Sequence, residues 1–95
     1  MVALPAREPL LEQVLAWSTI NSGTGNLDGL GEVGAAIATV AARLPGEVIW
    51  CDPAPVESVR ADGASAPVAH GRHMVLSVRP QATRRVLLTG HMDTV

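Results

Sequence analysis

An unbroken apolar run, Val86-Leu87-Leu88, most limits the folds open to this chain of 95 residues. A strand with one face in water alternates apolar and polar residues, whereas this run has no polar position. Such runs are typical of strands that helices cover on both faces. The run therefore predicts a buried strand over residues 85–89, in the interior of the sheet of an α/β fold.

Two helices are expected ahead of the strands. Apolar residues recur at the helical period over residues 6–18, with acidic residues near the start. A cluster of Gly, Ser, Thr and Asn then predicts a loop over residues 20–26. An alanine-rich second helix is expected over residues 28–44, because the Pro-Gly pair that follows would end it.

Strands are expected in the second half of the chain. Residues 47–50 begin a first strand, and the alternating residues 56–61 form its continuation or its partner. Residues 62–71 are expected to be turn and loop, and residues 73–79 a second strand. With residues 85–89 as the third, the predicted order is α-α-β-β-β.

Composition argues against several classes of protein. The hydrophobic content of 47% indicates a globular chain, and without Phe or Tyr its core must consist mainly of Ala, Val, Leu and Ile. The basic residues are scattered arginines and the net charge is −2, so no nucleic-acid partner is expected. Cys51 is the only cysteine, which leaves no disulfide framework. Because no signal peptide or membrane span is visible, a cytoplasmic protein without a membrane partner is expected.

Gly29, Gly31 and Gly34 spell the GxGxxG pattern of dinucleotide-binding loops. That pattern binds a pyrophosphate where a strand leads into the glycine turn and a helix follows it. Here a polar loop and a helix precede it, so the glycines are interpreted as sites of close packing on the second helix. A strand over residues 20–28 would favour the nucleotide-binding alternative.

The SGTGN sequence of residues 22–26 allows two interpretations. A glycine-rich turn ahead of a helix can bind an anion through free backbone N–H groups. However, the Gly-Lys-Ser/Thr ending of a nucleotide-binding P-loop is missing. A tight structural turn, with Asn26 or Asp28 as the helix cap, is therefore favoured.

His91 and Asp93 follow the predicted buried strand after Gly90. Side chains two positions apart in an extended segment point to the same side, and sites in open α/β sheets gather at the carboxyl ends of strands. Imidazole is the commonest metal ligand, and a nearby carboxylate can hold its other ring nitrogen. The pair is therefore a candidate metal site, although a His and an Asp in a loop are also ordinary surface residues.

The segment VLLTGHMDTV, residues 86–95, resembles the first metal-binding segment of the dizinc aminoacylase, acetylornithine deacetylase and glutamate carboxypeptidase family. The sequence INSGTGNLDGL, residues 20–30, is similar to the loop ahead of that family's second helix. The order α-α-β-β-β also matches the opening of the family's catalytic domain. By this resemblance, His91 is a ligand of one zinc ion and Asp93 is the catalytic-site carboxylate that orients it.

The resemblance implies an α/β sandwich of the zinc-exopeptidase type with a central mixed sheet. It also implies hydrolysis of an amide or peptide bond in a small peptide or N-acyl amino acid, with two zinc ions, or cobalt or manganese, activating water. Residues 1–95 would be the N-terminal portion of a single catalytic domain, without the remaining ligands, the general base and the lid or dimerisation domain. The chain alone is therefore expected to be inactive, and the full-length enzyme to be compatible with a homodimer.

Two alternatives stay open beside the hydrolase. One is a non-catalytic α/β module that binds a ligand through the SGTGN loop, and the other is a nucleotide-binding protein. His70 and His73 have no counterpart in the family pattern. They are interpreted as loop and strand residues, because no carboxylate or Cys accompanies them at ligand spacing.

Overall fold

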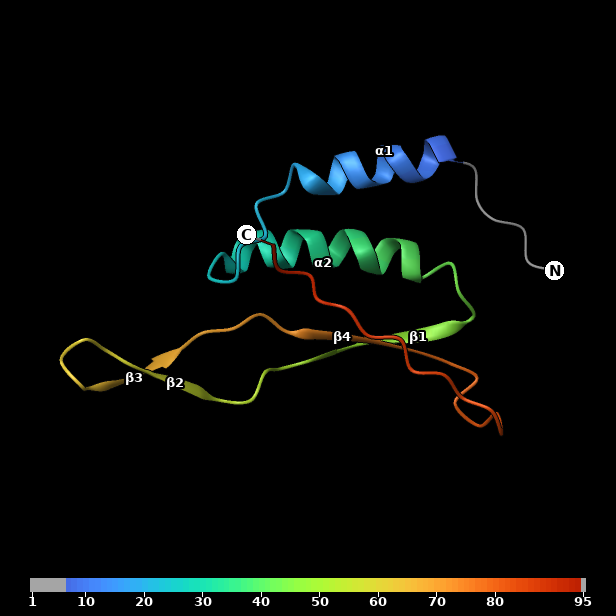
Figure 1. The fold of residues 1–95 in the computed structure, drawn as a ribbon. Helices are drawn as coiled ribbons and strands as arrows, with labels where there is room; N and C mark the ends of the chain where they lie inside the picture. Colours follow the sequence, from blue (N-terminus) through green and yellow to red (C-terminus); the bar gives the residue numbers. More distant parts are fainter. Residues whose placement is uncertain (1–6, 95) are drawn as a thin grey trace.

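The computed structural model describes residues 7–94, and these contain two helices followed by four strands (Figure 1). The elements are α1 (Arg7–Ser18), α2 (Leu27–Ala41), β1 (Gly46–Cys51), β2 (Val56–Val59), β3 (Ser65–Val68) and β4 (His73–Val78). The α/β class and the order of two helices before the strands are confirmed. Ala6, the expected first residue of the first helix, lies outside the described residues.

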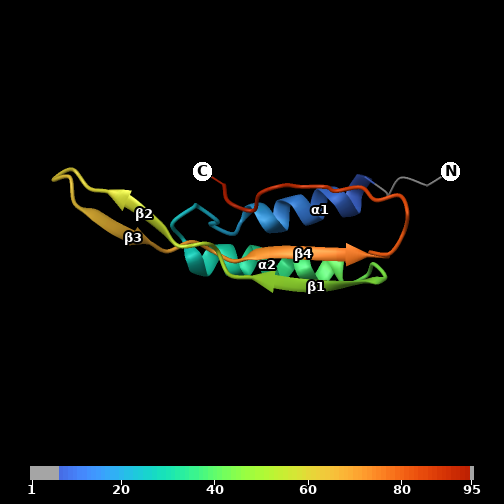
Figure 2. The same cartoon turned by 90° about the horizontal axis from the view of Figure 1, so that it is seen from below.

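Helix α2 lies at the centre of the packed part of the structure. Asn26 caps its first turn, where Asp28 also places a negative charge that the helix dipole favours. The helix buries Gly29, Val33 and Gly34, and it lies against one face of the β1–β4 sheet (Figure 2). Val33 is the one buried hydrophobic residue in the described part of the chain. The packed core of residues 7–94 is therefore small.

The four strands form two separate antiparallel pairs. β1 pairs with β4, with Gly46 opposite Val78 at one end of the ladder. β2 pairs with β3, with Val59 opposite Ser65 next to the turn, and this hairpin extends beyond the helices (Figure 1). The turn contains Gly63 at a φ of 85°, a left-handed conformation that glycine adopts without steric cost.

The β2–β3 hairpin corrects two expectations. β2 is neither a continuation nor a partner of the first strand, because it pairs with β3 in a second sheet. The expected turn and loop over residues 62–71 contains β3. The sequence of β3, SAPV, has a weak strand signal and includes Pro67, which is tolerated only at a sheet edge. The short connection to β2 supplies the pairing partner that local propensity does not reveal.

Residues 85–89 do not form the predicted strand. Val86, Leu87 and Leu88 are 86%, 85% and 88% exposed, so the expected burial on both faces is wrong. A strand needs a neighbour to satisfy its backbone N–H and C=O groups, and no described strand pairs with this run. From the end of β4, the chain instead returns unpaired toward the loop between α1 and α2 (Figure 1).

Helix α1 forms where the sequence predicts it, but its apolar side chains remain exposed. The exposed residues are Leu10, Leu11, Val14 and Leu15. The helix therefore forms although these four side chains are not buried against another element among residues 7–94. Neither α1 nor α2, the helices of this described range, is long and apolar enough to span a membrane.

Candidate functional site

Two segments about 70 positions apart in the sequence, residues 22–24 and 91–94, are joined by three hydrogen bonds. The backbone N–H of Thr94 donates to the carbonyl oxygen of Ser22 at 2.8 Å, and the hydroxyls of the same two residues lie 2.9 Å apart. The Thr24 hydroxyl donates to Oδ2 of Asp93 at 2.7 Å. The structure therefore brings together the glycine-rich loop and the His-x-Asp segment.

The SGTGN loop is a tight turn, as the sequence predicts. Oδ1 of Asn26 accepts from the Gly29 N–H at 3.0 Å, and Nδ2 of Asn26 donates to the Asn21 carbonyl at 2.9 Å. The Asn26 N–H also donates to the carbonyl of Gly23 at 2.8 Å. Asn26, rather than Asp28, is the cap of α2. Its side chain also holds the incoming chain against the helix end.

The glycines of the GxGxxG pattern do not form a nucleotide turn, since residues 20–26 contain no strand. A Cβ at Gly29 would clash with the carbonyl oxygen of Asn21, and one at Gly34 would lie 3.0 Å from the Trp50 ring. The interpretation as close-packing glycines is therefore confirmed at these two positions. A Cβ at Gly31 would meet no atom within 4 Å, so packing does not require glycine there.

His91 and Asp93 make the contact that their spacing predicts. Nδ1 of His91 lies 2.9 Å from the Asp93 carbonyl oxygen and 3.0 Å from Asp93 Oδ1. Both oxygens can only accept, so Nδ1 carries the proton and the lone pair of the neutral ring lies on Nε2. The His91 side chain is 84% exposed. An imidazole with Nε2 available and Nδ1 held by a carboxylate is the arrangement typical of a metal ligand.

The environment of Asp93 favours its ionised form. The hydrogen bond from the Thr24 hydroxyl is the largest influence that lowers the pKa of the Asp93 carboxyl below its ordinary value. Partial desolvation opposes this effect, while the hydrogen bond and the charge of His91 lower the pKa further. Asp93 is therefore a carboxylate at neutral pH, as an orienting partner of an imidazole must be.

A cavity of about 520 Å³ borders the exposed imidazole. Trp17 from α1, Ile37 from α2 and Met92 from the terminal segment give it an apolar lining, and His91 and Thr94 contribute polar groups. An apolar cavity with a few polar groups is the kind of space that small ligands occupy.

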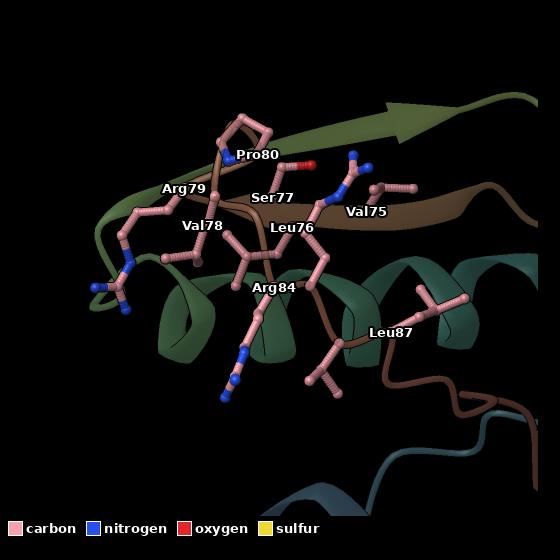
Figure 3. A pocket seen from close by; sticks show the side chains of 11 residues that line it. Val75, Leu76, Ser77, Val78, Arg79, Pro80, Arg84 and Leu87 are labelled. Atoms are coloured by element: carbon pink, nitrogen blue, oxygen red, sulfur yellow. The ribbon is translucent and has the colours of Figure 1, made fainter.

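A second hollow, of about 690 Å³, separates β4 from the exposed run of residues 84–87 (Figure 3). Val75 and Leu76 of β4 line one part of it, and Leu87 lines another. This groove shares no lining residue with the cavity at His91.

The candidate ligands do not gather into a complete metal site in the described residues. Within residues 7–94, no group of three or more His, Cys, Asp and Glu side chains lies close enough to hold a metal ion. His70 lies in a loop, with its Nε2 buried and without a hydrogen-bond partner, and His73 begins β4, as expected. Sequence reasoning did not identify Thr24, Ser22 or Thr94 as neighbours of the pair, because no local pattern reports a contact across about 70 positions.

Comparison of the chain with models of known protein families, with curated proteins and with solved structures gives no match. The contacts around His91 and Asp93 therefore carry the functional proposal.

Proposed function

We propose that this chain is the N-terminal portion of the catalytic domain of a dizinc hydrolase, which cleaves an amide or peptide bond in a small peptide or N-acyl amino acid. The observation that carries the proposal is the His91–Asp93 contact at 3.0 Å, which leaves Nε2 of an exposed imidazole available for a metal. The sequence resemblance of residues 86–95 supports the hydrolase class.

The residues present would supply one ligand of such a site and the carboxylate that orients it. His91 would bind one zinc ion through Nε2, and Asp93 would fix the tautomer of the imidazole and raise its basicity. Bound zinc ions would supply a water of lowered pKa and polarise the scissile carbonyl. A zinc site takes three or four protein ligands, whereas the described residues offer one with its orienting carboxylate. In this proposal the other ligands and the general base belong to residues outside this chain.

The apolar cavity beside His91 gives the proposal a place for substrate. Its lining by α1, α2 and the terminal segment would accept an apolar acyl group or side chain next to the metal. The zinc-exopeptidase sandwich with its mixed sheet, the lid domain and a homodimer belong to the same proposal.

The alternative of a binding module that uses the SGTGN loop gains little support. The side chains of Ser22, Thr24 and Asn26 are all engaged in hydrogen bonds within the chain. The loop also has no cationic side chain to attract an anion. We therefore propose that the loop holds the segment that contains His91 in place.

Zinc titration of the 95-residue chain, followed through the ¹⁵N signals of its three imidazoles, tests the metal-ligand assignment. Zinc should shift Nε2 of His91 at lower concentration than the nitrogens of His70 and His73. His91→Ala should remove this response, while the matched control His73→Ala should preserve it. A response centred on His70 or His73, or one that survives His91→Ala, would contradict the proposal.

The hydrolase assignment is tested in a longer protein that contains these residues. There, His91→Ala should abolish zinc-dependent amide hydrolysis. Asp93→Asn should weaken zinc binding by roughly 10-fold to 100-fold, the range for residues that orient a metal ligand. Full activity of His91→Ala with zinc present would show that the chemistry lies elsewhere.

A further inference from the structure

The carboxylate of Asp93 links two groups from opposite ends of the chain. Its Oδ2 accepts from the Thr24 hydroxyl at 2.7 Å, and its Oδ1 lies 3.0 Å from Nδ1 of His91. We propose that Thr24 is a positioning residue for His91 and acts through this carboxylate. The inference rests on the proposed role of His91 as a zinc ligand, and it assigns the glycine-rich loop a part in that site.

The Thr24 hydroxyl restricts the rotation of the carboxylate. The terminal torsion of an aspartate side chain is broad, so Asp93 alone has no strong preference for directing one oxygen at His91. A hydroxyl facing an ionised carboxylate can only donate, which makes the Thr24 contact directional. With Oδ2 held by Thr24, Oδ1 remains directed at Nδ1 of His91.

The loop itself is held firmly enough to serve this purpose. Ser22, two residues before Thr24, is 2% exposed and is bonded to Thr94 through both backbone and side chain. Asn26, two residues after it, caps α2. Thr24 is also β-branched, so few side-chain rotamers are open to it. Its hydroxyl is therefore a fixed donor, and its partner Asp93 lies next to the anchored Thr94.

The consequence is a defined direction for the metal-binding nitrogen. His91 is largely exposed, so its neighbours do not pack around the ring and fix its orientation. The two acceptors at Nδ1, both from Asp93, are what hold it. When Oδ1 turns away, only the Asp93 carbonyl oxygen remains, and the preference for the tautomer with the proton on Nδ1 weakens.

The imidazole tautomer of His91 tests this inference without metal. Thr24→Val removes the hydroxyl and keeps the branched shape, whereas Thr24→Ser keeps the hydroxyl. Thr39→Val is the matched control, because the Thr39 hydroxyl bonds only to the Ala35 carbonyl on α2. The measurement is the ratio of the two neutral tautomers of His91 from its ¹⁵N shifts in the 95-residue chain at a pH of about 8, above the ordinary pKa of histidine.

In Thr24→Val, the ratio of the Nδ1–H to the Nε2–H tautomer should fall by about threefold, the effect of one modest hydrogen bond. Thr24→Ser and Thr39→Val should retain the original ratio. In an Asp93→Ala background, Thr24→Val should cause no further change, because the carboxylate that transmits its effect is gone. Amide spectra of each variant would show that the fold is retained.

An unchanged ratio in Thr24→Val would overturn the inference. An equal loss in Thr24→Val and Thr24→Ser would overturn it too, because Thr24→Ser keeps the hydroxyl to which the effect is assigned. These outcomes are independent of the hydrolase proposal, since no zinc is present. If zinc titration fails to perturb His91 while the tautomer still responds to Thr24→Val, the proposed function fails and the positioning contact stands.

Discussion

Ser22 and Thr94 are joined by a backbone hydrogen bond of 2.8 Å and by a contact of 2.9 Å between their hydroxyls. Ser22 is the one buried polar residue in the described part of the chain. A buried hydroxyl that loses its partner costs more than a pair that is removed together, because the remaining group stays desolvated. We therefore expect that substituting both residues destabilises the Ser22–Thr94 contact less than substituting one of them.

Thr94→Val should lower the free energy of opening at the Ser22–Thr94 contact by about 1–2 kcal/mol, since it leaves the Ser22 hydroxyl unsatisfied. Adding Ser22→Ala should recover most of that loss, because both polar groups are then absent. Hydrogen exchange of the backbone amide of residue 94 measures the free energy of opening in each variant. A double variant with lower protection than Thr94→Val alone would contradict this account.

Gly29→Ala and Gly31→Ala should change stability in opposite directions. Alanine in a helix interior is favoured over glycine by about 1 kcal/mol, and Gly31 has open space for a Cβ. At Gly29 a Cβ would clash with the Asn21 carbonyl, so the substitution must displace the loop that supports His91. Thermal unfolding followed by far-UV circular dichroism should therefore show a higher midpoint for Gly31→Ala and a lower one for Gly29→Ala. Equal midpoints would mean that the loop can move away from a Cβ at position 29 without a loss of stability.

The features that could be predicted from the sequence depend on residues close together in the chain, and those that could not depend on residues far apart. The two helices, the Asn26 cap and the loop over residues 20–26 follow from signals that lie within a few residues of one another. The His91–Asp93 contact follows from their spacing of two. By contrast, Val86-Leu87-Leu88 could be buried in a strand only if another strand paired with it, and no described strand does so. The apolar run alone was therefore insufficient to predict a strand. Thr24 could not be placed at the site because its contact spans 69 positions.

The exposed Val86–Leu88 run should promote association between copies of the chain. Contiguous apolar side chains on an unpaired extended segment form a template for pairing with another chain. Leu88→Glu should therefore reduce association while leaving the helical signal unchanged, because Leu88 makes no packed contact to lose. Val59→Glu, at an exposed position in β2, is the control and should have less effect, because Val59 is not part of a continuous run. Sedimentation at increasing protein concentration would measure both variants, and equal reductions would argue against a special role of the run.

The Thr24–Asp93 contact should weaken in acid. The pKa of Asp93 is lowered in the folded chain, mainly by the Thr24 hydroxyl, so the carboxylate contributes stability that is present above the unfolded pKa, about 3.9. That contribution is lost as the pH falls through the lower folded pKa. NMR shifts of Thr24 should therefore move as the pH falls below about 4. Asp93→Asn should remove this acid transition at Thr24, and a transition that persisted in the variant would assign it to another carboxyl group.

The 95-residue chain alone should bind zinc weakly and hydrolyse neither N-acyl amino acids nor peptides with a C-terminal glutamate. The proposal assigns one imidazole, His91, as a ligand, whereas a catalytic zinc normally has three protein ligands and an open position for water. Asp93 could become a second ligand only by leaving Nδ1 of His91, which would remove the contact that orients the ring. Among residues 7–94 no third ligand lies close enough to complete the set. Calorimetric titration with zinc and an amide-hydrolysis assay on the purified chain check both statements. Tight stoichiometric binding with turnover would show that the site forms elsewhere in the chain.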